Sequence, residues 1–200
     1  MAMPAIRRRW TAADVRELTR EYRAWPRYEL IDGELLVTPA PRNVHQLAVS
    51  ELLVLVHAYL QKVPVGIAAH SPWDLELKPD TVVQPDVFVI PADTPNAREI
   101  RDWTDATSLL LAVEVLSPSS IRTDRITKRD FYLANGVEEY WIIDLDARVF
   151  ERWCASSETP EVLRDQITWS PAGRDPLTIE LPDWFARIDR THAALPPRFK

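Results

Sequence analysis

Two acidic residues interrupt long apolar runs and are the first candidates for chemistry. Asp86 lies within residues 82–90 and Glu114 within residues 109–116, and both runs are otherwise almost wholly apolar. Burying an ionised carboxylate costs several kcal/mol or more unless a cation or hydrogen-bond donors accompany it. Two such carboxylates on neighbouring strands could share one divalent ion, and oxygen ligands suit Mg²⁺ or Mn²⁺. The alternative is that each acid forms a structural ion pair with one of the 20 arginines.

Lys128 is the third candidate. The chain has only four lysines against 20 arginines, so the position of each lysine is informative. In a helix that begins near Asp124, Lys128 shares a face with Phe131 and Tyr132 and therefore lies beside packing residues. It could reach over the sheet edge toward the two acids, where an ammonium group positions water or stabilises charge on a phosphate. The alternative is a lysine whose stem covers apolar surface while its ammonium stays in solvent.

Hydrophobic spacing and turn signals predict the elements that hold these residues. Residues 82–90 and 109–116 are typical of central strands covered on both faces, and residues 73–77 alternate like a half-buried strand. Helices are expected over 11–22, 43–61 and 124–135, hairpins over 28–37 (turning at Asp32-Gly33) and 139–153, and short strands after residue 154, including 177–181. This order favours an α/β (α+β) fold with a mixed sheet and few helices over a regular doubly wound fold.

Composition restricts the class of protein. The 200 residues, 46% hydrophobic and 27% charged, are typical of one soluble globular domain spanning 1–200. The apolar runs are too short to cross a bilayer, and the polar stretch after Arg9 argues against a signal peptide. The lone Cys154 excludes an internal disulfide and a cysteine-built zinc site, so we expect a cytoplasmic protein. The net charge of −6 argues against a broad basic surface for duplex DNA.

Five short motifs follow one another along the chain. They are YELIDGEL at 28–35, HQ at 45–46, QPDV at 84–87, VEVLSPS at 113–119 and GVEEYW at 136–141. In this order and at these separations they resemble the Uma-type putative restriction endonuclease family of the PD-(D/E)xK nuclease superfamily. The resemblance covers about residues 20–185. It implies a restriction endonuclease-like fold, in which helices flank a mixed central sheet that follows an N-terminal hairpin, with a divalent metal at the acidic centre.

The resemblance also assigns roles to particular residues. Asp86 and Glu114 match the metal-binding acids, and the backbone carbonyl of Val115 is the usual further ligand. The superfamily places a lysine two residues after the second acid, where this chain has Leu116. Lys128, on the following helix, is the expected replacement.

Three further residues have two interpretations each. Glu34 falls at a family motif position and is either an outer metal ligand or a solvated glutamate beside a hairpin turn. His45 is either a packed histidine at a helix start or a group that contacts water or phosphate. Asp74 alternates with apolar neighbours and either joins the acidic cluster or faces solvent.

The leading hypothesis is an endonuclease that hydrolyses DNA phosphodiester bonds with Mg²⁺ or Mn²⁺, using Asp86, Glu114 and Lys128. The alternative is a catalytically weak or inactive nuclease-fold module for binding or regulation. The missing lysine after Glu114, the acidic net charge and the lack of a separate DNA-reading domain favour this alternative. We also expect self-association, most simply as a two-fold homodimer, because the eight tryptophans and a weakly patterned C-terminal third could supply an interface.

Overall fold

A six-stranded mixed sheet lies at the centre of the computed structural model, which describes residues 9–21, 25–94 and 108–196. In spatial order its strands are β3 (Gly66–His70), β4 (Val87–Pro91), β5 (Leu111–Val115), β6 (Glu139–Asp144), β7 (Val149–Cys154) and β8 (Glu161–Leu163). Strands β5 and β6 pair in parallel, and the other neighbours pair antiparallel. All five residues of β5 are buried, as its continuous apolar run predicts. The predicted mixed sheet is confirmed.

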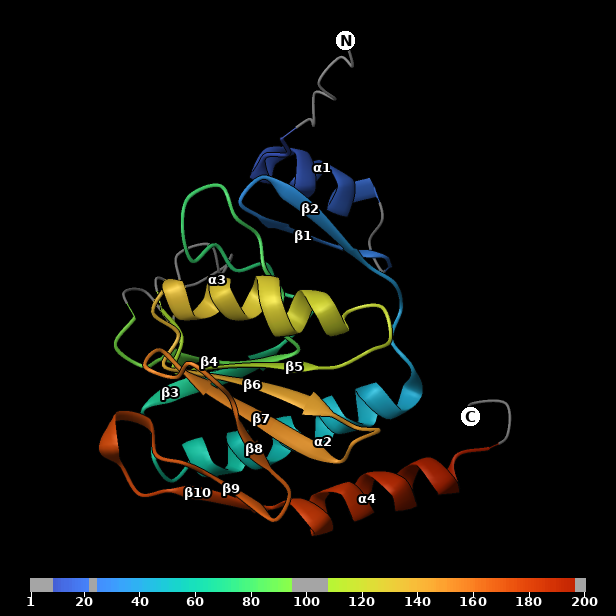
Figure 1. Ribbon diagram of the computed structural model, residues 1–200, viewed down its shortest axis with the longest axis vertical. Helices are drawn as coiled ribbons and strands as arrows, with labels where there is room; N and C mark the ends of the chain where they lie inside the picture. The colour runs from blue at the N-terminus through green and yellow to red at the C-terminus, as the bar shows by residue number, and fades with distance from the viewer. Residues whose placement is uncertain (1–8, 22–24, 95–107, 197–200) are drawn as a thin grey trace.

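Helices cover both faces of this sheet (Figure 1). On one face lie α2 (Asn43–Leu60) and α4 (Leu181–Ala194), together with the hairpin of β9 (Gln166–Trp169) and β10 (Leu177–Glu180). Trp141, Trp169 and Trp184 form much of the core on that side. On the other face lies one continuous helix, of which the first part, η2 (Thr123–Lys128), is π-helical and the second part, α3 (Arg129–Ala134), is α-helical.

An N-terminal helix and hairpin pack beyond α3 (Figure 1). Helix α1 (Ala12–Glu21) has the predicted reciprocal cap, in which the Thr11 and Asp14 side chains each accept a hydrogen bond from the other's main-chain amide. Strands β1 (Arg27–Ile31) and β2 (Glu34–Thr38) form the predicted hairpin. Its turn residues Asp32 and Gly33 have φ values of 53° and 81°, as a type I′ turn requires.

The structure corrects several predicted boundaries. Strand β4 begins only at Val87, because the proline at position 85 has no amide hydrogen for a ladder. Residues 73–77 form no regular strand, since Leu75 makes a single bridge to Val83. Residues 177–181 are a strand only up to position 180, and α4, which was not predicted, begins at residue 181. Its buried residues, with helical spacing, are Leu181, Trp184, Phe185 and Ile188. Residue 22, where the first predicted helix ends, lies outside the described residues.

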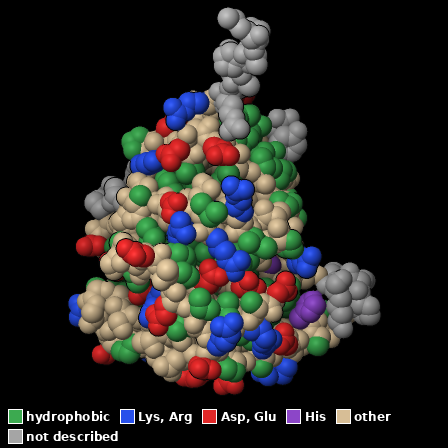
Figure 2. Space-filling model, viewed as in Figure 1, with side chains coloured by type: hydrophobic (Ala, Val, Ile, Leu, Met, Phe, Trp, Pro, Cys, Tyr) green, Lys and Arg blue, Asp and Glu red, His purple; other side chains and the backbone are tan. Residues whose placement is uncertain are grey.

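The surface is mixed in charge. Figure 2 shows acidic and basic side chains interspersed over one face, in keeping with the net charge of −6. Among the described residues, no helix has the length and apolar character needed to cross a membrane. The face seen in Figure 2 therefore offers no broad basic patch to a polyanion.

Candidate active site

A cavity of about 220 Å³ opens between two loops. Both loops lie beyond the same end of the central strands (Figure 1). One loop joins β2 to α2, and the other joins β5 to η2. The lining residues are Arg27, Glu29, residues 38–42, His45, Asp86, Glu114, Val115, residues 117–120, Asp124 and Lys128. The cavity therefore brings together Asp86, Glu114, Val115, His45 and Lys128 from the predicted set.

The antiparallel pairing of β4 and β5 explains why the two predicted acids meet. Val87 of β4 pairs with Val113 of β5, so that Asp86, just before β4, falls beside Glu114. Directly opposed residues of an antiparallel pair point to the same face of the sheet. Both side chains are buried, with 3% of each residue exposed. Two apolar strands therefore carry two carboxylates into one cavity.

Asp86 is surrounded by polar groups from three other segments. Its Oδ1 accepts a hydrogen bond from Arg27 Nη2 at 3.0 Å, and its Oδ2 accepts one from the Val115 amide at 2.9 Å. His45 Nε2 lies 3.2 Å from Oδ2. Burial alone would raise the pKa of Asp86, but His45, Arg27 and the Val115 amide hold it well below its usual value. The carboxylate is thus ionised at any ordinary pH.

Lys128 lies between two buried glutamates. Its Nζ is 2.9 Å from Glu114 Oε1 and 2.8 Å from Glu29 Oε2, with Asp124 Oδ1 at 3.8 Å. Burial alone would lower the pKa of Lys128, but Glu114, Glu29 and Asp124 raise it well above its usual value. The predicted approach of the ammonium to Glu114 is therefore present, and the lysine stays protonated.

The π-helical turns of η2 bury two charged residues of one helix together. Asp124 and Lys128 are 1% and 4% exposed, and both line the cavity. Wider π-helical turns are uncommon and occur frequently at functional sites. The α-helix that follows directs Phe131 and Tyr132 into the core, and the Tyr132 hydroxyl donates a hydrogen bond to Glu114 Oε1 at 3.2 Å. One helix thus supplies both Lys128 and the Tyr132 hydroxyl, and the hydroxyl orients Glu114, the ion-pair partner of Lys128.

Acids outnumber permanent cations inside the cavity. Its four buried carboxylates belong to Glu29, Asp86, Glu114 and Asp124, and its two buried permanent cations are Arg27 and Lys128. Burial and the neighbouring acids raise the pKa of Glu114 well above its usual value, against the opposing effect of Lys128. Burial likewise raises the pKa of Asp124 to about 6. The excess negative charge is chemically suited to a divalent cation.

The oxygen atoms available as ligands limit which ion could bind. Asp124 Oδ1 is buried without a hydrogen-bond partner among the described residues, and carboxylate oxygens suit Mg²⁺ or Mn²⁺. Across residues 9–21, 25–94 and 108–196, however, no three His, Cys, Asp or Glu side chains are grouped to hold a metal by themselves. Asp86 and Glu114 are therefore two candidate carboxylate ligands, and an ion there would need further oxygens from the main chain or from water.

The raised pKa of Asp124 gives the first testable prediction. Its pKa is about 6, against an ordinary value of 3.8, so the folded state favours the protonated carboxyl. The stabilisation from this group is complete below pH 4 and is lost as the pH rises through 6. Asp124→Asn is expected to match the wild type at pH 4 and to be more stable at pH 8, by up to about 3 kcal/mol. Urea unfolding at both pH values, without divalent ions, measures the difference; equal stabilities at pH 8 would contradict the buried charge.

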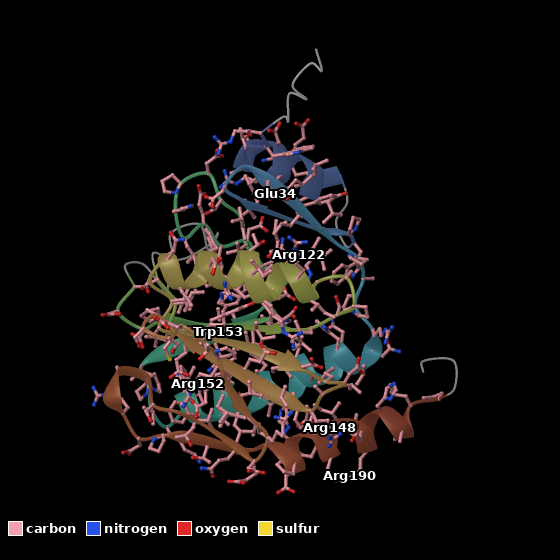
Figure 3. The ribbon with its side chains drawn as sticks, viewed as in Figure 1. Glu34, Arg122, Arg148, Arg152, Trp153 and Arg190 are labelled. Atoms are coloured by element: carbon pink, nitrogen blue, oxygen red, sulfur yellow. The ribbon has the colours of Figure 1, made fainter. Side chains whose placement is uncertain are left out.

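The structure does not bring Glu34 to the cavity. Arg27 and Thr38, at the open end of the hairpin, line the cavity, whereas Glu34 pairs with Ile31 beside the turn. The two ends are about 13 Å apart along the strands. Glu34 is exposed, and Figure 3 shows it at the hairpin near α1. The carboxylate that β1 contributes to the cavity is that of Glu29.

Asp74 also lies outside the cavity lining. Its Oδ1 accepts a hydrogen bond from Gln84 Nε2 at 2.7 Å. The main-chain amide of Gln84 in turn donates a hydrogen bond to Glu29 Oε1 at 2.8 Å. Burial raises the pKa of Asp74, in spite of the hydrogen bond from Gln84. Asp74 is therefore linked to the site through one intervening residue and does not face the cavity.

Sequence reasoning missed Arg27, Glu29 and Asp124. Glu29 follows the pattern that identified Asp86, because it is a charge within the apolar segment 28–31, and it is 1% exposed. Arg27 carries no comparable signal, since one arginine among 20 is unremarkable. Asp124 was interpreted only as a helix start, and the wider turn that buries it is not encoded in a simple periodicity.

Comparison with known proteins identifies the family and the fold. A family model, Uma2, described as "Putative restriction endonuclease", matches residues 16–181. The fold is similar to that of a crystal structure described as a putative nuclease belonging to DUF820 from Anabaena variabilis ATCC 29413, which is 20% identical. The similarity covers 82% of this chain and 92% of that chain, with a TM-score of 0.67, and confirms the predicted nuclease-type fold. A search of curated proteins returned no match.

Proposed function

Because the chain belongs to the Uma2 family of putative restriction endonucleases, we propose that it hydrolyses DNA phosphodiester bonds with Mg²⁺ or Mn²⁺. The observation that carries this proposal is the buried Lys128 ammonium, 2.9 Å from Glu114, in the cavity that also contains Asp86. An acid pair beside a fixed cation suits a reaction in which a phosphate gains negative charge.

The metal site of this proposal consists of Asp86 and Glu114, with the Val115 carbonyl as the further ligand that the family resemblance implies. A bound divalent ion would lower the pKa of a coordinated water and neutralise phosphate charge. Arg27 and the Val115 amide fix the orientation of Asp86. The Tyr132 hydroxyl does the same for Glu114.

Lys128 acts in this proposal as an electrostatic group and not as a base. Its raised pKa keeps the ammonium protonated, so it cannot accept a proton from water. A protonated lysine can donate hydrogen bonds to a phosphate oxygen or to the attacking water. Glu29, at 2.8 Å, holds the ammonium in position from the side of β1.

The Arg27–Asp86 pair favours a second candidate, a nuclease-fold module with weak or no catalysis. Both Asp86 oxygens already have partners, and the guanidinium is 8% exposed. A cation in that position reduces the attraction of Asp86 for a metal ion. If the Arg27–Asp86 ion pair persists when metal is present, the protein binds DNA or another partner and does not cleave DNA.

A metal-titrated cleavage assay decides between the two candidates. Supercoiled plasmid and single-stranded DNA are incubated with Mg²⁺ or Mn²⁺ across a concentration range, with Asp86→Ala as the matched inactive control. Metal-dependent cleavage that disappears in Asp86→Ala supports the endonuclease. The same trace activity in both proteins would indicate a contaminant and favour the non-catalytic module.

A pair of glutamate variants tests which acid of the hairpin belongs to the site. Glu29→Gln is expected to lower cleavage by about 10- to 100-fold, the usual effect of losing a residue that orients a ligand or catalytic group. Glu34→Gln, beside the turn of the same hairpin, is expected to cleave like the wild type. Initial rates at saturating Mg²⁺ measure both, and a larger loss in Glu34→Gln would reverse the assignment.

We also propose that the protein is a homodimer, but the structure narrows the surfaces that could form it. Trp141, Trp169 and Trp184 are fully buried within the chain and cannot serve as interface anchors. Trp153, 6% exposed, is almost as inaccessible. A dimer is therefore expected to use other surfaces. Light scattering at micromolar concentration tests this expectation, and a monomer mass would contradict it.

A further inference from the structure

The N-terminus of α2 opens into the mouth of the cavity. This helix has 18 residues, and Arg42 occupies its N-cap position without making a side-chain capping hydrogen bond. Its first turn contains no acidic residue. The amides of a first helical turn have no partners within the helix and form the positive end of its dipole. This end of α2 therefore keeps a positive potential that no described carboxylate of its own turn offsets.

His45 supplies a second and independent indication of a ligand. The residue is 6% exposed, lies in the first turn of α2 and lines the cavity. Its Nδ1 is buried and has no hydrogen-bond partner among the described residues, while its Nε2 lies 3.2 Å from Asp86 Oδ2. A buried polar atom without a partner costs free energy, so such an atom beside a cavity indicates a missing partner.

Arg42 brings an exposed positive charge to the same place. Its side chain is exposed and makes no ion pair with any described residue, although it lines the cavity. The facing wall is the loop of residues 117–120, where the Ser117 and Ser119 hydroxyls lie 3.1 Å apart. Donors thus surround the mouth, whereas the carboxylates lie deeper inside.

We propose that the N-terminus of α2, with Arg42 and His45, binds a phosphodiester group of DNA next to the bond that is cleaved. This inference rests on the proposed endonuclease function, since it concerns the same substrate and the same cavity. The helix amides and Arg42 attract the phosphate at the mouth. His45, carrying a proton on each ring nitrogen, donates to it through Nδ1 from the inner side, while Nε2 faces Asp86 Oδ2. The sugar-phosphate backbone of the DNA then runs between the loop of residues 38–42 and the loop of residues 117–120.

Arg42→Asp separates this role from a structural one. Aspartate is a favourable N-cap residue, so its carboxylate can accept hydrogen bonds from the amides of the first turn. The variant is therefore expected to melt at the wild-type temperature or above it. Because the same amides are then occupied and a negative charge stands at the mouth, affinity for DNA is expected to fall by about tenfold or more.

The binding probe is a short fluorescent DNA duplex, titrated by anisotropy with Ca²⁺ in place of Mg²⁺. Arg190→Asp is the matched control, since it changes the net charge equally on the exposed side of α4, away from the cavity (Figure 3). A second pair of variants, Arg42→Ala and Arg190→Ala, is titrated at several salt concentrations. The slope of log affinity against log salt should decrease in magnitude by about one in Arg42→Ala and stay unchanged in Arg190→Ala. His45→Gln is also expected to weaken binding of the duplex.

The outcomes separate the inference from the proposed function. Cleavage by the wild type, together with equal DNA affinity in Arg42→Asp and Arg190→Asp, would overturn the phosphate site and leave the nuclease standing. DNA binding that depends on Arg42, without cleavage in Mg²⁺ or Mn²⁺, would support the phosphate site and favour the non-catalytic module. Absence of measurable binding of the duplex by the wild type would overturn the phosphate site.

Discussion

Replacing Asp86 by asparagine is expected to remove metal-dependent cleavage and to lower the free energy of unfolding by about 3–5 kcal/mol. The neutral amide cannot balance the Arg27 guanidinium, which is 8% exposed and 3.0 Å from Asp86 Oδ1. The variant therefore keeps a buried cation without its counter-charge. Urea unfolding measures the stability, and the plasmid assay measures the cleavage.

A double variant separates the structural effect of Asp86 from the chemical one. Arg27→Met combined with Asp86→Leu replaces the buried ion pair by apolar side chains, an exchange that is often neutral or stabilising. We expect this protein to recover most of the lost stability and to remain inactive, with weaker Mn²⁺ binding by calorimetry. Substantial cleavage by either variant would show that Asp86 does not hold the catalytic metal.

Lys128→Met is expected to reduce cleavage by about 10²-fold or more, the scale of one well-placed electrostatic group. Removing the ammonium leaves Glu29, Glu114 and Asp124 facing one another without a buried cation between them. Their mutual repulsion grows as they ionise, so the loss of stability should also grow as the pH rises from 5 to 8. Urea unfolding at pH values about one unit apart measures this trend. Metal binding, measured by calorimetry, should be largely retained.

Lys78→Met is the matched control for this experiment. Lys78 pairs with Asp32 at 2.6 Å, its side chain is 38% exposed, and it does not line the cavity. Its loss should change neither cleavage nor the pH dependence of stability, because exposed ion pairs contribute little. A similar loss of cleavage in both lysine variants would point to an effect of net charge and would contradict the assigned role of Lys128.

Local signals made the sheet and its hairpins predictable. The continuous apolar run of residues 109–116 predicted β5, and the hairpin expected over 139–153 predicted β6. The pair Asp32-Gly33 predicted the turn of the N-terminal hairpin. Helix α4 was missed even though its apolar residues have helical spacing, because the preceding prolines favoured the interpretation as strands. The π-helical part of η2 depends on burial of Asp124 and Lys128 against the sheet, which is a tertiary effect.

The candidate site was predictable where a charge stood out against apolar neighbours. Asp86 and Glu114 satisfied that test, and the helix register brought Lys128 to them. Glu34 was expected at the site because of its place in a motif, yet the structure places Glu29 there. Which residues of a hairpin face a cavity depends on how the hairpin docks, and the sequence of the hairpin alone does not contain that information.

The docking of that hairpin places the residues of the site on two separate parts of the fold. Arg27 and Glu29 belong to β1, whereas Asp86, Glu114 and Lys128 belong to the sheet and its covering helix. Among the described residues, a main-chain bridge joins Leu30 of β1 to Val82, just before β4, through two hydrogen bonds of 2.6 and 2.9 Å. Local opening of the hairpin, visible as early amide hydrogen exchange in β1, would separate the ion pairs while the sheet stays folded. The fraction of competent enzyme would then follow the free energy of this local opening and not that of global unfolding.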